Sequence, residues 1–337
     1  MDNVLPTEGN RIDEYGESPV YFRRMPKPRR LPQALPVEEG FAVSAGLALN
    51  IPRKRLDASD LVTTHHGIRV SARPLAPRDL DVSFVRARLE SGTVLAEASG
   101  ARCWGLPLPR WLEAEMLTHV AVAQPAHPPT GKLIRGYRLD PKRFVSTDFG
   151  DIPTLAPATL LAQLAARLTL VQAVMFADAL RTSFEHYPGR SPLVPMHSLD
   201  ELTSVARQWK GRPGAATFRA ALELSRQGSE SPKETQLRLL VVSAGFPEPV
   251  VQHKLFVPGY GKARIDLAYV REMVALEFEG EGHFKDAASA RRDLARTEAL
   301  QRAGWRVIRV TEADLKSPRL LFESIRRALA ERKRRRP

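Results

Sequence analysis

Residues 264–284 read RIDLAYVREMVALEFEGEGHF, and this stretch decides the fold expected for the second half of the chain. Two short apolar runs flank a polar turn at 270–272, which is the pattern of a β-hairpin. Glu277 and Glu279 are two residues apart, so a strand places both carboxylates on one face. Pairing the two strands brings Asp266 beside that face. We therefore expect three carboxylates to converge.

Converging carboxylates need a counter-charge, because like charges a few ångströms apart raise one another's pKa. A divalent cation supplies that charge, and Mg²⁺ in particular prefers one or two carboxylates together with water and phosphate oxygens. His283 follows Gly280 and Gly282, in a segment flexible enough to turn its imidazole back toward the acids. Acidic residues on a strand are also typical of the solvent-exposed face of a half-buried sheet. The interpretation of these acids as ordinary surface residues therefore stays open.

Asp266, then Glu277-x-Glu279, then His283 resemble the active-site core of the PD-(D/E)XK nuclease superfamily. Within it, they are similar to the very-short-patch-repair-type endonucleases and their bacterial relatives. In the superfamily pattern a lysine usually stands two residues after the second acid, and here that position is Glu279. That branch often carries an acid there, which leaves the proton-handling group unassigned. His283 is the first candidate and Lys285 the second.

The resemblance extends over residues 229–330, about a third of the chain. Upstream, SPKETQLR at 231–238 is similar to the entry helix of that branch, whose acidic residue falls on Glu234. A serine also caps this helix with Glu234 at its third position, so capping explains the same carboxylate equally well. Downstream, RDLARTEAL at 292–300 and GWRVIR at 304–309 are similar to the family's helix and closing strand.

The resemblance implies a Mg²⁺- or Mn²⁺-dependent endonuclease that hydrolyses DNA phosphodiester bonds, in defence or in repair. It also implies an α/β fold with a restriction-endonuclease-like mixed sheet flanked by helices. The metal ligands would be Asp266 and Glu277, and the wider catalytic group would be Asp266, Glu277, Glu279, His283 and Glu234. The implied phosphate-binding residues are Arg264, Arg292, Arg296 and Arg309. Asp293 and Arg296 also have the i, i+3 spacing of a surface ion pair on a helix, which is the alternative for that arginine.

Residues 56–228 are expected to form an N-terminal α+β domain. Three pieces resemble, in order, the C-terminal module of AbiEi-type antitoxins: ASGARCWGLPLP at 98–109, HVAVAQP at 119–125 and IPTLAPATLLAQLA at 152–165. This resemblance implies the alternative function, a catalytically inactive, DNA-binding, antitoxin-like transcriptional regulator with a toxin-like or defence partner protein. In that family a winged-helix segment usually precedes the module, and the proline-rich residues 1–55 do not predict one.

The N-terminal domain offers three clear elements. Residues 119–123 predict a strand, residues 132–138 predict its partner, and residues 159–180 predict one long helix with a broad apolar face. Asp178, near the end of that helix, is expected to be a polar contact that holds the helix rather than a catalytic acid. A polar stretch places the domain boundary near Gly228.

The composition favours a nucleic-acid partner inside the cell. Lysine and arginine total 51 against 38 aspartates and glutamates, a formal net charge of +13, which favours nucleic acid first and anionic membrane second. The 337 residues are enough for two domains. The one cysteine, Cys103, excludes an intrachain disulfide and a multi-cysteine zinc site. Because no run of eighteen apolar residues predicts a membrane span, we expect a cytoplasmic protein.

The two ends of the chain have the composition of flexible segments. Residues 1–55 are rich in proline and arginine, which disfavours sustained helix, and we expect them to be disordered or loosely packed. The tail at 331–337 is basic, which adds either salt-sensitive affinity for DNA or solubility alone. The expected organisation is therefore a loose segment at 1–55, an α+β module at 56–228, a nuclease-like domain at 229–330 and a basic tail.

Overall fold

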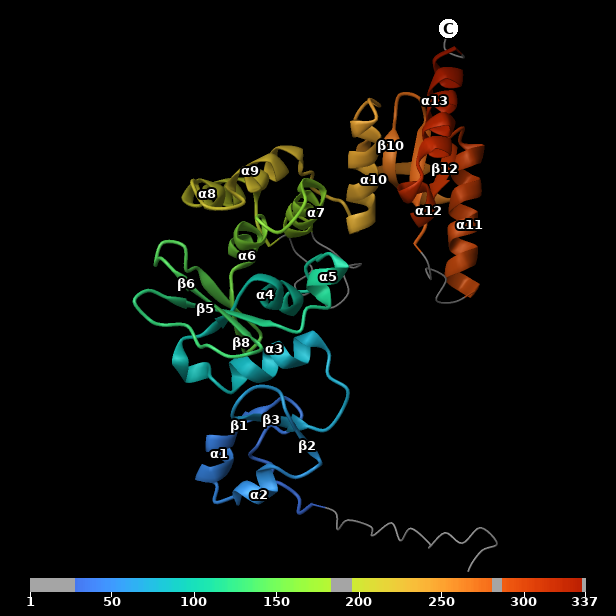
Figure 1. Cartoon of the computed structure of the whole chain (residues 1–337). Coiled ribbons are helices and arrows are strands. Elements are labelled where there is room, and N and C mark those ends of the chain that lie inside the picture. Colours follow the sequence, from blue (N-terminus) through green and yellow to red (C-terminus); the bar gives the residue numbers. More distant parts are fainter. Residues whose placement is uncertain (1–27, 183–195, 281–286, 335–337) are drawn as a thin grey trace, which may run out of the picture.

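The computed structural model in Figure 1 describes residues 28–182, 196–280 and 287–334. Three separate sheets, each accompanied by helices, follow one another along the chain, so the expected α/β class is confirmed. Within the described ranges, the helices are too short or too polar to traverse a lipid bilayer. The predictions that fall on residues 1–27, on His283 and Lys285, and on residues 335–337 lie outside the described residues.

The first folded unit is small and begins inside the segment expected to be loose. It contains a three-stranded antiparallel sheet in the order β1-β3-β2 and two short helices. Its elements are β1 (Phe41–Ala42), α1 (Val43–Ala48), α2 (Arg53–Leu56), β2 (Leu61–Thr63) and β3 (Ile68–Ser71).

The expectation of a disordered or loosely packed segment at 1–55 is therefore wrong for the part of that range from residue 41 onward. Phe41, Val43, Ile51 and Leu56 are buried together in one apolar cluster, which stabilises the unit. Pro52 precedes the first residue of α2, a place where its missing N–H removes no intrahelical hydrogen bond. Proline density alone was thus a poor guide to disorder here.

The central module is built on a five-stranded sheet in the order β6-β5-β4-β8-β7. The strands are β4 (Val94–Leu95), β5 (Thr118–Ala123), β6 (Ile134–Leu139), β7 (Ser146–Phe149) and β8 (Ile152–Leu155). Its helices are α3 (Pro77–Arg86), α4 (Glu97–Cys103), α5 (Arg110–Glu113), α6 (Pro157–Leu164) and α7 (Leu170–Leu180), with a 3₁₀ turn at Leu89–Ser91. The predicted strand at 119–123 and its partner are confirmed, and they pair in parallel as β5 and β6.

The single helix predicted over 159–180 is two helices, α6 and α7. Thr169 and Gln172 form a capping box, in which each side chain accepts a hydrogen bond from the other residue's backbone N–H. This motif starts a helix, so it divides an otherwise continuous apolar pattern. Two further helices, α8 (Leu199–Gln208) and α9 (Ala215–Leu224), complete the module and pack on the same core.

The C-terminal domain has a four-stranded mixed sheet in the order β12-β11-β10-β9. Its strands are β9 (Val250–Val257), β10 (Gly261–Tyr269), β11 (Val274–Phe278) and β12 (Arg306–Val310). Its helices are α10 (Pro232–Ser243), α11 (Ala287–Arg302), α12 (Glu312–Lys316) and α13 (Arg319–Arg334). β9, β10 and β11 are antiparallel, whereas β11 and β12 are parallel. One apolar cluster joins the sheet to α10, α12 and α13, and a second joins it to α11, so helices flank the sheet as expected.

A buried ion pair joins the central module to the C-terminal domain across α7 and α10. Asp178 is fully buried and accepts hydrogen bonds from the Arg226 backbone N–H at 2.7 Å, Thr235 Oγ1 at 2.8 Å and Arg238 Nη2 at 3.1 Å. Arg238 is itself 2 % exposed and also donates to the Leu224 carbonyl. Asp178 is therefore the structural polar contact that the sequence predicts, and it fixes the helix that opens the C-terminal domain.

Candidate active site

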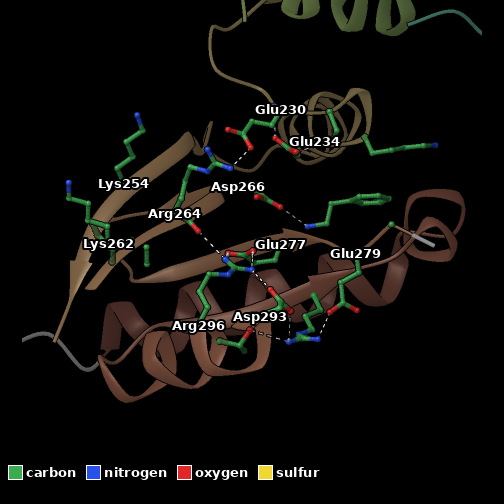
Figure 2. Close-up of a pocket in the computed structure, with 18 of the residues that line it drawn as sticks. Glu230, Glu234, Lys254, Lys262, Arg264, Asp266, Glu277, Glu279, Asp293 and Arg296 are labelled. Carbon is green, nitrogen blue, oxygen red and sulfur yellow. Dashed lines mark hydrogen bonds and ion pairs between the residues drawn. The ribbon is translucent and has the colours of Figure 1, made fainter. Parts of the chain in front are cut away.

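A pocket of about 1220 Å³ lies where the first turn of α10, the β9–β10 hairpin, the end of β11 and one side of α11 meet (Figure 2). This volume exceeds the ~300–1,000 Å³ typical of small-molecule sites, so the pocket has room for part of a polymer. Acidic side chains line its centre, and lysines and arginines surround them.

Two adjacent strands and one helix bring three carboxylates together. The pairing of Leu267 with Leu276 places Asp266 next to Glu277 across β10 and β11. Asp266 accepts a hydrogen bond from the Phe278 backbone N–H at 3.0 Å, which fixes its carboxylate at the end of β11. Glu234 reaches the same place from the first turn of α10.

Glu234 is both the capping residue and a neighbour of the acids. Its carboxylate accepts hydrogen bonds from the Glu230 backbone N–H at 2.8 Å, Ser231 Oγ at 2.9 Å and Gln252 Nε2 at 2.8 Å. The Ser231 hydroxyl in turn accepts from the Glu234 backbone N–H. The side chain is 6 % exposed, and these bonds tie it to Gln252 on β9 as well as closing the helix end.

Burial raises the pKa of all three carboxyls, and the charge of Asp266 raises it further for Glu234 and Glu277. Burial first, and then the charge of Asp266, raise the pKa of Glu234 to about 8 and that of Glu277 to about 7. Burial also raises the pKa of Asp266 above its ordinary value. Carboxyls perturbed in this way are typical of functional sites, because the same charge cluster that is costly alone is favourable around a cation.

Glu279 lies in the same pocket but apart from this trio. Its side chain is 38 % exposed and forms an ion pair with Arg309. Figure 2 shows its carboxylate near α11, away from Asp266. The acid that joins Asp266 and Glu277 is therefore Glu234 rather than the expected Glu279.

Among the arginines expected to bind phosphate, Arg264, Arg296 and Arg309 form ion pairs with acids that line the pocket. Arg296 donates to Glu277 Oε1 at 3.0 Å and lies 2.8 Å from Glu277 Oε2, and it also donates to Asp293 at 2.7 Å. Although burial alone would lower it, these contacts raise the pKa of Arg296 above its ordinary value. The i, i+3 contact with Asp293 confirms the ion pair that the spacing suggested.

The other arginines differ in their surroundings. Arg264 forms an ion pair with Glu230 on the α10 side of the pocket, and Arg309 contacts Glu279 and also donates to Thr297 at 3.0 Å. Arg292 is exposed on α11 and is not one of the described residues that line the pocket. The rim thus carries cationic groups, but most of the arginines are already neutralised by neighbours.

Mg²⁺ fits the oxygen donors at this centre, although the side chains alone do not form a complete coordination shell. Within the ranges that the structure describes, no group of three or more acidic, histidine or cysteine side chains is arranged to hold a metal ion. Mg²⁺ usually takes only one or two carboxylates and completes its shell with water and phosphate. Asp266 and Glu277, adjacent and carrying raised pKa values, match that requirement.

Sequence reasoning missed several residues of the pocket. Gln252 stands opposite Asp266 in the β9–β10 ladder, with a backbone φ of +51° that is uncommon outside glycine. Glu230, Lys254 and Lys262 also line the pocket. For Gln252, Lys254 and Lys262, the signal that could have found them is the register in which β9 pairs with β10. The hairpin turn sets this register, and it cannot be derived from the residue pattern of either strand alone.

The chain is similar to two mycobacterial proteins over part of its length. It is 27% identical over 116 residues to "Uncharacterized protein Rv2248" of Mycobacterium tuberculosis (strain ATCC 25618 / H37Rv) and to "Uncharacterized protein MT2308" of strain CDC 1551 / Oshkosh. The match covers 34% of this chain and 43% of each relative, so the chain spans less than half of their length. No family model matches the chain. No solved structure matches it either.

Proposed function

We propose that the chain is a Mg²⁺- or Mn²⁺-dependent endonuclease that hydrolyses DNA phosphodiester bonds. The observation that carries the proposal is the buried trio of Glu234, Asp266 and Glu277 at the centre of a pocket with a basic rim. The resemblance of Asp266 and Glu277-x-Glu279 to the PD-(D/E)XK core supports it, as does the formal net charge of +13. A DNA substrate also agrees with a location in the cytoplasm.

Each side chain has a role that its surroundings suit. Asp266 and Glu277 would hold the cation, which when bound lowers the pKa of an attacking water and stabilises charge on the leaving oxygen. Glu234, with a pKa of about 8, exchanges protons near neutral pH and is oriented by three hydrogen bonds, so it is suited to acid–base work beside Asp266. Lys254 and Lys262 supply positive charge for the phosphates on either side.

Nicking of supercoiled plasmid by the full chain tests this function, with Mg²⁺, Mn²⁺ or EDTA present. Asp266→Asn and Glu277→Gln should each lower the metal-dependent rate by at least about 100-fold, the scale on which loss of one catalytic group acts. Glu298→Gln is the matched control, because Glu298 is an exposed acid on α11 that pairs with Arg302. Nicking that persists in both site variants would show that the carboxylates are not the catalytic centre.

One observation favours a second candidate function, a DNA-binding regulator that does not cut. Arg296 contacts both carboxylate oxygens of Glu277 and so acts as a built-in counter-charge. Glu279, at a position where the PD-(D/E)XK superfamily pattern usually has lysine, also favours a protein that does not cut. With the AbiEi-like residues 98–165, such a regulator would act with a toxin-like or defence partner. In the plasmid assay it would shift DNA in a gel while wild type and variants stayed equally inert with every metal.

A further inference from the structure

The β9–β10 hairpin presents a large aromatic side chain to solvent beside the pocket. Phe256 is 73 % exposed, whereas the next residue of β9, Val257, is 1 % exposed. Tyr260, in the turn that follows, is 37 % exposed. A single exposed apolar residue is ordinary on a protein surface, so its surroundings decide whether Phe256 has a function.

Those surroundings are cationic and lie on one face of the hairpin. Phe256 pairs with Lys262, and Lys254 pairs with Arg264. Cross-strand partners project from the same face, as do residues two apart on one strand, so one face carries all four side chains. Among the described residues, neither Lys254 nor Lys262 has a carboxylate partner, and both line the pocket.

The same face continues to the acidic centre. Figure 2 shows Lys262, Arg264 and Asp266 in succession along the hairpin. The four steps from Lys262 to Asp266 span about 13 Å at ~3.3 Å per residue. That length equals the rise of about four stacked nucleotides at 3.4 Å each, and of fewer in an unstacked strand. The surface therefore has the charge and the length to guide a nucleic-acid strand to the carboxylates.

We propose that the β9–β10 hairpin is a binding arm for single-stranded DNA. An unpaired base stacks on Phe256, Lys254 and Lys262 hold the neighbouring phosphates, and the strand runs on to Asp266 and Glu277. This inference rests on the proposed nuclease function and specifies its substrate. A phenyl ring stacks only on a base whose face is free, and a paired base has to leave its stack first, which costs a few kcal/mol. The arm therefore favours strands with unpaired bases over intact duplex.

Fluorescence anisotropy with the full chain carrying Asp266→Asn, which binds without cutting, tests the arm. The probes are a labelled 12-nucleotide DNA strand containing 2-aminopurine, its duplex and an RNA strand of the same sequence. Adding Phe256→Ala should weaken single-strand binding about 5- to 150-fold, the usual range for one stacked base, and remove the quenching of 2-aminopurine. Phe256→Trp should restore both. Leu320→Ala is the control, because Leu320 is also exposed, at 64 %, but lies on α13.

The lysines are tested separately through salt dependence. Lys254→Ala with Lys262→Ala should reduce the slope of log affinity against log salt by about 1.4, at ~0.7 for each phosphate contact on a single strand. Phe256→Ala should leave that slope unchanged, because stacking releases no counterions. A slope unchanged by the lysine pair would overturn their assignment to phosphates.

The experiments distinguish a failure of the proposed binding arm from a failure of the proposed nuclease function. Three results would each overturn the proposed arm, whether or not plasmid is cut. Phe256→Ala could weaken the binding of single strand and duplex equally, it could leave binding unaffected, or the protein could prefer RNA over DNA. Phe256-dependent binding of single strands by a protein that never cuts would support the arm and refute the nuclease. Retained circular dichroism of each variant excludes loss of folding as the cause.

Discussion

The buried carboxylates should make the metal-free protein less stable as the pH rises. Burial and the charge of Asp266 raise the pKa of Glu234 to about 8 and of Glu277 to about 7, from an ordinary 4.5. The folded state therefore keeps protons that the unfolded chain releases. The stability associated with those protons is fully present below about pH 4.5 and is lost as the pH rises through 7 and 8.

The size of this loss follows from the pKa values. One pKa unit corresponds to about 1.4 kcal/mol, so the rise of Glu277 to about 7 alone corresponds to roughly 3 kcal/mol between pH 4.5 and 8. Glu234 adds to this, but the two carboxyls share the charge of Asp266, so their contributions do not sum. A loss of roughly 3 kcal/mol is a large fraction of the stability of an ordinary domain.

Urea unfolding in EDTA at pH 5.5, 7 and 8.5 measures this loss, followed by the fluorescence of the buried Trp305 in a background in which the other three tryptophans are replaced by phenylalanine. Asp266→Asn removes the shared charge and should make the pH dependence shallower, with the part caused by burial remaining, while Glu298→Gln should leave it unchanged. Mg²⁺ should stabilise the protein more at pH 8.5 than at 5.5, because it competes with protons for the same oxygens. A pH dependence that is flat in wild type, or equally steep with Asp266→Asn, would refute the coupling of these acids.

Two further predictions concern the scaffold, and both are measured by denaturant midpoint. Asp178→Ala leaves the buried Arg238 with Glu248 as its remaining carboxylate partner and removes the acceptor of Thr235, so it should cost about 3–5 kcal/mol. Asp148→Ala, an exposed change on β7, should stay within about 0.5 kcal/mol. Equal costs would mean that the buried pair does not stabilise the joint. Gly214→Ala places a Cβ 2.3 Å from the Ala166 backbone nitrogen at a φ of +79°, whereas Gly211→Ala has the same φ with nothing within 4 Å. Gly211→Ala should cost about 1–2 kcal/mol for the backbone alone, and Gly214→Ala should cost more; the reverse order would contradict the close approach.

The elements of the C-terminal domain could be predicted because their patterns are local. The two apolar runs around the turn at 270–272 locate β10 and β11, and the serine–proline start locates α10. For Glu234 the sequence allowed two roles, capping and a place beside the acids, and the structure shows that they are compatible. The first turn of α10 lies against β10, so one carboxylate closes the helix and faces Asp266.

The composition of the pocket could not be predicted in the same way, because it depends on pairing between segments. Gln252 reaches Glu234 only because β9 and β10 pair in one register. Glu279 follows Glu277 on the same strand face, yet it sits just after β11 ends and turns toward Arg309. The folded unit that begins at Phe41 escaped notice for a related reason: its strands are two to four residues long and are stabilised by partners that no local pattern identifies.

The ion pair between Asp178 and Arg238 also has a consequence for the recombination of the two modules during evolution. A gene fragment that encoded only residues 229–337 would keep the contact of Arg238 with Glu248 but expose this residue, 2 % exposed in the whole chain, without its buried partner Asp178. Recombination at the polar stretch near Gly228 would therefore carry a penalty that its loop-like sequence conceals. A crossover that separates the two modules would therefore be tolerated best together with a compensating change at Asp178 or Arg238.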